Sequence, residues 1–134
     1  MYIGIDFDGT VVKHAFPNIG EDIGAVPVLK NLVKNGHKLI LTSMRSHRLT
    51  DGIDTLTEAE NWFKSHDIEL FGVNNNPTQQ RWTDSPKPYA NLYIDDASLG
   101  CPLKMDEGED RPYVDWKVLD TWFKSVGLIS TVIA

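Results

Sequence analysis

Two aspartates, Asp6 and Asp8, stand one residue apart directly after a short apolar run at residues 2–5. Such a run, followed by turn residues, is typical of a buried strand. Side chains alternate between the two faces of an extended strand, so residues two apart share a side. Both carboxylates therefore converge just beyond the carboxyl end of the strand, which is where open α/β sheets bind ligands.

A divalent metal ion is one reason to place two carboxylates so close together. Neighbouring carboxylates disfavour each other's ionisation, and a buried unpaired charge is costly. A hard cation with oxygen ligands resolves both problems, and Mg²⁺ accepts a few carboxylates while keeping water and phosphate as further ligands. Gly9 allows the sharp turn that follows. A simple surface turn remains the alternative at this point, because Asp-Gly is a common turn signal.

Two other apolar runs also end in residues that can do chemistry. One ends in the hydroxyl residues Thr42 and Ser43, and a later one ends in a second acidic pair, Asp95 and Asp96. Because the carboxyl ends of parallel strands meet at one edge of a sheet, we expect these groups to lie near the first acidic pair.

The rest of the pattern alternates strands with helices. Short apolar runs predict strands at residues 2–5, 37–43, 68–73 and 90–94. Apolar stripes at helical spacing predict helices at residues 25–35, 50–65, 115–126 and, as a short element, 78–81. Residues 97–111 are predicted to be irregular, and residues 128–134 to form an edge strand or a tail. This alternation implies parallel pairing with right-handed crossovers.

The bulk composition is that of one globular domain covering residues 1–134, with 41% hydrophobic and 24% charged residues. The net charge of −6 argues against nucleic-acid or membrane-surface partners, which favour a basic face. Cys101 has no second cysteine to pair with, which fits a reducing compartment. No apolar run approaches membrane-spanning length, and no signal-peptide pattern opens the chain, so a cytoplasmic location is expected.

Taken together, four motifs in order resemble those of the haloacid dehalogenase superfamily of Mg²⁺-dependent phosphohydrolases. They are Asp6-Phe7-Asp8-Gly9-Thr10, the strand 39–43 with its terminal hydroxyl, Lys87, and Asp95-Asp96. The resemblance covers roughly residues 2–97. The chain is most similar to the small capless phosphatases, because it has no insertion long enough for a cap domain. The resemblance implies a three-layer α/β/α sandwich around a Rossmann-like parallel sheet. We predict that the first strand is flanked by the second and fourth, because all acidic and hydroxyl motifs then meet at one edge of the sheet.

The resemblance also implies a role for each acidic residue. Asp6 would be the nucleophile that forms an aspartyl-phosphate. Asp8 would protonate the leaving oxygen and then activate water. Mg²⁺ would be held by Asp6, the backbone carbonyl of Asp8 and Asp95, while Asp96 would orient the metal's waters or Lys87.

Other residues would contact the phosphate. Small relatives commonly carry Thr-x-Arg at the second motif, which aligns Ser43 with the phosphate-binding hydroxyl and makes Arg45 a substrate contact; Thr42 is the alternative hydroxyl. Lys87 would offset the charges of phosphate and Asp6, with Lys104 as the alternative lysine. Gly9 and Thr10 belong to the same substrate-binding loop.

The leading functional hypothesis is therefore a phosphatase for a small phosphomonoester. One alternative is a non-catalytic module that binds Mg²⁺ or a phosphoryl group on the same fold. Another is a phosphatase for a macromolecule, either a nucleic-acid end or a phosphoprotein, because a site without a cap accepts a large substrate. A second subunit of a homo-oligomer is a further way to cover such an open site.

Overall fold

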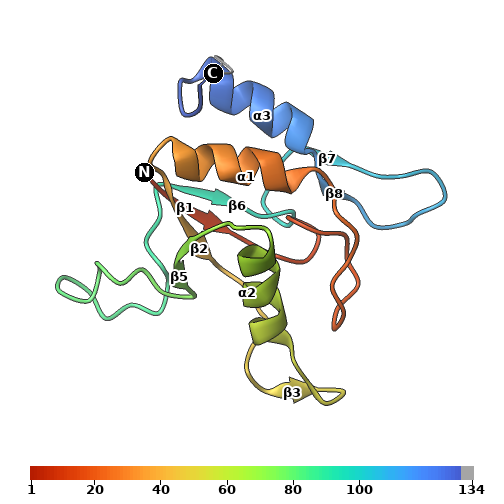
Figure 1. Cartoon of the computed structure of the whole chain (residues 1–134), viewed down its shortest axis with the longest axis horizontal. Helices are drawn as coiled ribbons and strands as arrows, with labels where there is room; N and C mark the ends of the chain where they lie inside the picture. Colours follow the sequence, from red (N-terminus) through yellow and green to blue (C-terminus); the bar gives the residue numbers. More distant parts are fainter. Residues whose placement is uncertain (131–134) are drawn as a thin grey trace.

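A parallel sheet of four strands lies at the centre of the computed structural model, which describes residues 1–130. Its strands are β1 (Tyr2–Ile5), β2 (Lys38–Leu41), β5 (Leu70–Val73) and β6 (Leu92–Ile94), in the order β5-β2-β1-β6. The first strand is thus flanked by the second and the last of these strands, as predicted (Figure 1). The carboxyl ends of all four strands share one edge, so residues that follow them are brought together.

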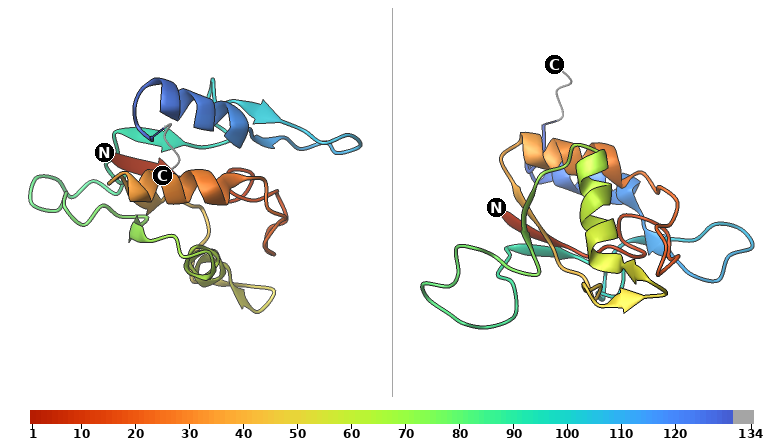
Figure 2. Two further views of the ribbon diagram at one scale, coloured as in Figure 1. Left: turned by 45° about the horizontal axis from the view of Figure 1, so that its top comes forward. Right: turned by 60° about the horizontal axis from the view of Figure 1, so that its bottom comes forward.

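Three helices pack on the sheet: α1 (Ala25–Lys34), α2 (Thr55–Ser65) and α3 (Trp116–Ser125). Their buried apolar residues form one core with alternate residues of the strands. On the sheet the core includes Ile3, Ile5, Leu39, Leu41 and Ile94, and on the helices Leu29, Leu32, Ala59, Phe63, Leu119 and Phe123. Because alternate strand residues share a face, all three helices lie on the same side of the sheet, which Figure 2 shows from two directions.

The handedness of the connections explains this arrangement. The chain moves in one direction from β1 to β2 to β5, and two right-handed crossovers in the same direction put α1 and α2 on one face. The last helix then packs beside α1. The α/β class and the central parallel sheet are confirmed, but within residues 1–130 the second helical layer of a three-layer sandwich is not seen.

Residues of the irregular segment 74–91 contact the opposite face instead. The Tyr2 ring lies 5.5 Å from the Phe71 ring and 6.0 Å from the Tyr89 ring, and the Tyr93 hydroxyl donates to the carbonyl of Pro88 at 2.6 Å. The three prolines of the segment oppose a helix, because each lacks an N–H donor. The short helix predicted at residues 78–81 is accordingly a set of turns.

The helix predicted at residues 50–65 begins at Thr55, so its first five residues were predicted wrongly. They belong to a hairpin of β3 (Leu49–Thr50) and β4 (Ile53–Asp54). Asp51 and Gly52 turn this hairpin with positive φ angles of 51° and 77°, which a helix does not contain. Asp54 then caps α2 by accepting a hydrogen bond from the N–H of Thr57 at 3.0 Å.

A second hairpin occupies the region that was predicted to be irregular. Its strands are β7 (Leu103–Lys104) and β8 (Tyr113–Val114), and it projects from the body in Figure 1. Lys13 holds the hairpin through ion pairs with Asp106 at 2.6 Å and Glu109 at 2.9 Å. The strand or tail predicted at residues 128–134 lies partly outside the described residues. No helix within residues 1–130 is long and apolar enough to cross a membrane.

Candidate metal and phosphoryl site

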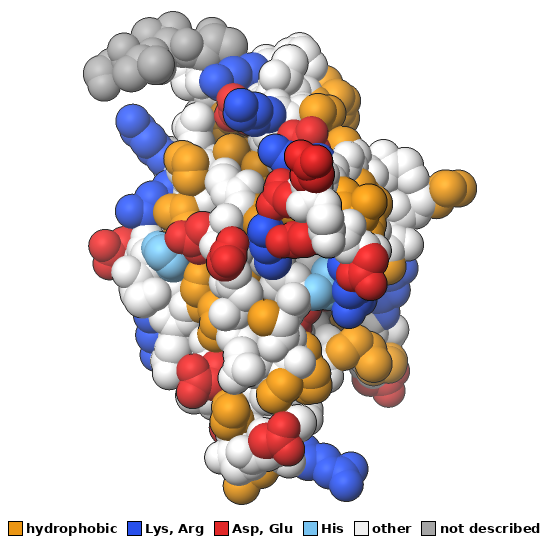
Figure 3. All heavy atoms as spheres, turned by 90° about the vertical axis from the view of Figure 1, so that its right-hand side faces the viewer, with side chains coloured by type: hydrophobic (Ala, Val, Ile, Leu, Met, Phe, Trp, Pro, Cys, Tyr) orange, Lys and Arg blue, Asp and Glu red, His pale blue; other side chains and the backbone are white. Residues whose placement is uncertain are grey.

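Three carboxylates meet at the carboxyl edge of the sheet. Asp6 follows β1, and Asp95 and Asp96 follow β6; each offers an oxygen that lies within 4.8 Å of the others. The neighbouring position of β1 and β6 in the sheet brings them together, as the sequence predicted for the two acidic pairs. Figure 3 looks at this side of the molecule, where acidic side chains gather beside basic ones.

Thr10 connects the ends of the two strands. Its hydroxyl donates to Asp6 Oδ2 at 2.8 Å and accepts a hydrogen bond from the N–H of Asp96 at 3.0 Å. The residue is fully buried, and its carbonyl accepts a hydrogen bond from the indole N–H of Trp116 at 2.7 Å. Predicted as part of the substrate-binding loop, Thr10 here fixes Asp6 and Asp96 relative to each other.

The carboxyl group of Asp6 is strongly perturbed. Burial is the largest cause and raises its pKa to about 7; the negative charges of Asp95 and Asp96 act in the same direction, while the Thr10 hydrogen bond opposes them. A group of this kind gains from a nearby cation, because positive charge restores the ionised form. An oxygen-only donor set that needs a cation fits Mg²⁺.

His14 lies against the triad from the loop after β1. Its Nε2 is 2.8 Å from Asp96 Oδ2, across 82 residues of sequence. A Cβ atom on Gly9 would collide with both His14 Nε2 and Asp96 Oδ2, and Gly9 has a positive φ of 79°. Only glycine therefore allows this pair to close over the loop.

Asp8 points to a different partner, Arg45, and is not a member of the triad. Arg45 Nε donates to Asp8 Oδ2 at 2.8 Å and its Nη2 donates to Oδ1 at 2.7 Å, a bidentate pair. The sequence predicted the side of Asp6 for both aspartates, whereas the turn at Gly9 leaves Asp8 facing the loop after β2.

Arg45 was predicted as a substrate contact, but it is buried, with 3% of its surface exposed. Its remaining donors bond the carbonyls of Pro17 at 3.3 Å, Thr55 at 3.0 Å and Asn18 at 2.8 Å. The guanidinium also lies between two rings, 4.9 Å from Phe7 and 5.2 Å from Phe16. All five N–H groups are used within the chain, so the direct substrate contact of Arg45 stays a prediction that this arrangement does not favour.

The two candidate hydroxyl residues end β2 with different neighbours. The Thr42 methyl lies near Gly4 on the face of the sheet away from the helices, and its N–H donates to the carbonyl of Ile5 at 2.8 Å. Ser43 Oγ accepts a hydrogen bond from the N–H of Arg45 at 3.0 Å, and its own N–H donates to Asn74 Oδ1 at 2.8 Å. Both residues lie at the same edge as Asp6.

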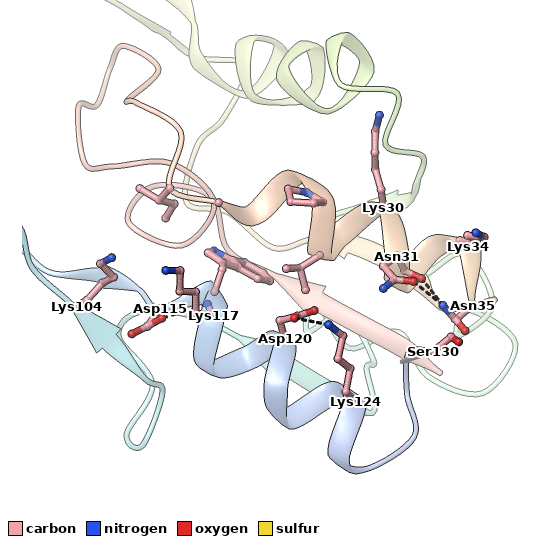
Figure 4. A pocket seen from close by; sticks show the side chains of 15 residues that line it. Lys30, Asn31, Lys34, Asn35, Lys104, Asp115, Lys117, Asp120, Lys124 and Ser130 are labelled. Carbon is pink, nitrogen blue, oxygen red and sulfur yellow. Dashed lines mark hydrogen bonds and ion pairs between the residues drawn. The ribbon is translucent and has the colours of Figure 1, made fainter. Parts of the chain in front are cut away.

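The two candidate lysines lie in different parts of the structure. Lys87 Nζ lies 5.1 Å from the centre of the Tyr93 ring, and Tyr93 packs against Gly4, two residues before Asp6. Lys104 instead lines a groove of about 940 Å³ between α1 and α3, together with other lysines (Figure 4). None of the three triad carboxylates lines that groove.

Two buried amides that sequence analysis missed fix the backbone around Lys87. Gln79 Nε2 donates to the carbonyl of Lys87 at 3.0 Å, and Gln79 Oε1 accepts from the N–H of Tyr89 at 2.7 Å. Asn76 Nδ2 donates to the carbonyl of Tyr89 at 2.9 Å. Local sequence carries no signal for these contacts, because an amide in a polar loop is usually solvated.

We expect Mg²⁺ to raise the melting temperature of this protein. At a hundredfold excess over its dissociation constant, a ligand adds about 2.7 kcal/mol of stability. The increase is larger at about pH 8 than at about pH 5.5, because at the lower pH Mg²⁺ must displace a proton from Asp6. Differential scanning fluorimetry with Mg²⁺ or EDTA measures the effect.

The matched variants for this measurement are Asp95→Asn, which removes a triad carboxylate, and Asp84→Asn, which removes an exposed one outside the triad. Asp95→Asn should lose the Mg²⁺-dependent increase and Asp84→Asn should keep it. An equal response of both variants would contradict the assignment of the metal site.

The chain has a relative among solved structures. No family model matches it, and no curated protein does. A conserved protein from Bacteroides thetaiotaomicron is 33% identical, with 94% of this chain and 91% of that chain covered and a TM-score of 0.73. Identity over nearly the full length of both chains, together with the shared fold, shows that this chain belongs to the same family as the conserved Bacteroides protein.

Proposed function

We propose that this protein is a Mg²⁺-dependent phosphatase of the haloacid dehalogenase type that hydrolyses a small phosphomonoester. The observation that carries the proposal is the carboxylate triad of Asp6, Asp95 and Asp96, whose oxygens lie within 4.8 Å of one another at the carboxyl edge of the sheet. The motif Asp-x-Asp-Gly-Thr at residues 6–10 adds support. The three triad carboxylates would hold Mg²⁺, with the backbone carbonyl of Asp8 as a further candidate ligand. When bound, the ion offsets the charge between an anionic nucleophile and a phosphate.

Asp6 is the proposed nucleophile. One of its oxygens attacks phosphorus as the bond from phosphorus to the leaving oxygen breaks, which gives an aspartyl-phosphate; water then attacks phosphorus and releases inorganic phosphate. The hydrogen bond from Thr10 to Asp6 Oδ2 fixes the plane of the carboxylate before the substrate arrives. Such preorganisation lowers the cost of reaching the attack geometry.

The phosphate would be held by residues at the ends of the other strands. Ser43 or Thr42 would donate a hydrogen bond from the end of β2, and Lys87 would supply positive charge from the face without helices. Among residues 1–130 no separate domain covers this edge, so macromolecular phosphoesters are also candidate substrates.

Asp8 is the proposed acid and base. Its contact with Arg45 uses one lone pair on each carboxylate oxygen, so a second lone pair on each oxygen remains to carry a proton to the leaving group. The same observation favours the second candidate function, a module that binds Mg²⁺ and a phosphoryl group without turnover, because such a module needs Asp8 only as a structural anion.

Phosphate release from a panel of substrates separates the two functions. The panel includes sugar, nucleoside and amino-acid phosphates, a phosphopeptide and end-phosphorylated oligonucleotides, each with Mg²⁺ and with EDTA. Release that depends on Mg²⁺ supports the phosphatase. Binding of Mg²⁺ in calorimetry, with no release from any substrate, would favour the binding module.

The leaving group should reveal the role of Asp8. We expect Asp8→Asn to slow hydrolysis of an alkyl phosphate by ~10²–10⁴-fold, the usual contribution of a general acid. Hydrolysis of nitrophenyl phosphate should be impaired less, because nitrophenolate leaves without a proton. Steady-state rates on the two substrates measure the difference, and equal losses on both would show that Asp8 does not supply the proton.

A further inference from the structure

His14 is a partner of the triad that the four sequence motifs do not contain. Its ring reaches the carboxyl edge of the sheet from the loop after β1, and its Nε2 lies 2.8 Å from Asp96 Oδ2. An ionised carboxylate only accepts hydrogen bonds, so the ring nitrogen is the donor. Both side chains are largely shielded from water, with 17% of His14 and 16% of Asp96 exposed. A hydrogen bond in such surroundings is stronger than one at the open surface.

The two carboxylate oxygens of Asp96 face different neighbours. Oδ2 contacts His14, whereas Oδ1 lies 3.4 Å from the hydroxyl of Thr10. That hydroxyl donates to Asp6 Oδ2 at 2.8 Å, so Oδ1 is the oxygen of Asp96 on the side of Asp6. Because His14 fixes Oδ2, it also determines which oxygen of Asp96 is turned toward the other carboxylates of the triad.

The loop that carries His14 has an anchor of its own. The preceding residue, Lys13, forms ion pairs with Asp106 at 2.6 Å and Glu109 at 2.9 Å, both in the β7–β8 hairpin. The N–H of Lys13 also donates to the carbonyl of Glu21 at 3.0 Å. None of these contacts involves the triad. The imidazole is therefore presented to Asp96 by a loop whose backbone is held from another direction.

Gly9 packs against the same pair. A Cβ atom at this position would collide with His14 Nε2 and Asp96 Oδ2, the two atoms of the hydrogen bond. Backbone hydrogen bonds hold Gly9 in place, because its N–H donates to the carbonyl of Val12 at 2.8 Å and its carbonyl accepts from the N–H of Val114 at 3.0 Å. Gly9 therefore restricts the movement of both side chains on that side.

A carboxylate that binds a metal ion usually accepts a hydrogen bond from a neighbouring residue. Such a bond holds the ligand in the orientation that the ion requires, and its loss typically weakens metal binding by about 10–100-fold. Asp95 obtains its bond locally, because its Oδ1 accepts from the N–H of Ala97 at 2.9 Å. Asp96 instead depends on a side chain 82 residues away in the sequence.

We propose that His14 is a positioning residue that holds Asp96 for the binding of Mg²⁺. Its hydrogen bond to Oδ2 turns Oδ1 toward the space between the triad carboxylates. The proposal rests on the metal site of the proposed function and assigns to that site a residue from the loop after β1. It does not require turnover, so it holds equally for a module that only binds Mg²⁺.

Calorimetric titration of Mg²⁺ into the full chain tests the proposal, with every protein first freed of metal by EDTA and dialysed into one buffer. His14→Ala should bind Mg²⁺ about 10–100-fold more weakly than wild type. His14→Phe keeps a planar ring without the donor and should show the same loss, which provides a second variant if His14→Ala does not fold. His14→Gln retains an N–H donor and should recover most of the affinity.

His47→Ala is the matched control. His47 forms a comparable contact with Asp54 at 2.9 Å, and neither residue belongs to the triad. Its removal should leave the affinity for Mg²⁺ at the wild-type value. Circular dichroism and urea denaturation of the metal-free proteins separate a loss of metal binding from a loss of the fold.

The outcomes distinguish this inference from the proposed function. If wild type binds Mg²⁺ and the folded His14→Ala and His14→Phe proteins bind it equally tightly, His14 does not position Asp96, and the metal site itself stands. If wild type binds no Mg²⁺, both the metal site and the role of His14 are refuted.

Discussion

Asp6→Asn should abolish phosphate release, with a loss on the order of 10⁴-fold or more, because a neutral amide lacks the anionic oxygen that attacks phosphorus. The loss should be equally severe for nitrophenyl and alkyl phosphates, in contrast to Asp8→Asn. Rates of phosphate release on both substrates, with mass spectrometry to exclude deamidation, measure it. A folded Asp6→Asn protein with wild-type turnover would refute the proposed nucleophile.

Asp6→Asn should increase the stability of the metal-free protein, although it abolishes phosphate release. Burial raises the pKa of Asp6 from 3.8 to about 7, so the folded state binds a proton that the unfolded state releases between these values. The stability contributed by this group is complete below about pH 4 and is lost as the pH rises through about 7. A shift of three pKa units corresponds to on the order of 4 kcal/mol.

Metal-free Asp6→Asn protein should therefore be more stable than wild type at about pH 8, and the difference should disappear near about pH 4. Urea denaturation in EDTA at both pH values measures it. Asp84→Asn, at an exposed position, controls for the general effect of removing one negative charge. A difference that does not depend on pH would show that Asp6 ionises normally in the folded protein.

Removal of Arg45 should destabilise the protein more than any surface change. Arg45→Met leaves Asp8 partly buried without its partner, with 19% of its side chain exposed, and removes a hydrogen bond to each of three backbone carbonyls. Breaking a buried ion pair by removing one member costs about 3–5 kcal/mol. Arg45→Lys should also be destabilised, because one ammonium group cannot replace a planar fork of five donors.

Urea denaturation compares these variants with Arg48→Met, which removes an exposed arginine three residues away. We expect the control to change stability by less than about 0.5 kcal/mol. Asp8→Asn combined with Arg45→Met should recover part of the loss, since it removes the unpaired charge. If Arg45→Met and Arg48→Met are equally stable, the bidentate pair does not hold the loop.

The sequence predicted the elements whose pattern is local. Apolar runs located the four strands of the central sheet, stripes at helical spacing located the three helices, and the need to bring Asp6 near Asp95 placed β1 between β2 and β6. The start of α2 was missed because the apolar pattern continues through a hairpin that Asp51 and Gly52 turn by their positive φ angles.

The contacts of the candidate site were less predictable, because they join distant residues. Arg45 and Asp8 are 37 residues apart in the sequence, and His14 and Asp96 are 82 residues apart. No local sequence pattern therefore predicts either contact. The positive φ of Gly9, which leaves room for the His14–Asp96 contact, is likewise set by residues distant in the sequence. We also did not predict that one face of the sheet lacks helices. The right-handedness of the crossovers fixes the side of the sheet on which α1 and α2 lie, but it does not fix the structure of the segment that connects β5 to β6.

Because one face of the sheet lacks helices, the segment 74–91 is the part of the fold that can most easily become longer. It joins β5 to β6 outside the helical core, so a longer connection there adds material without altering the packing of the three helices. Lys87, the candidate phosphate-binding lysine, belongs to this segment, so growth at this point also changes the surroundings of that residue. Under the proposed phosphatase function, a change in the length of one loop would therefore alter substrate preference while the core sequence stays the same.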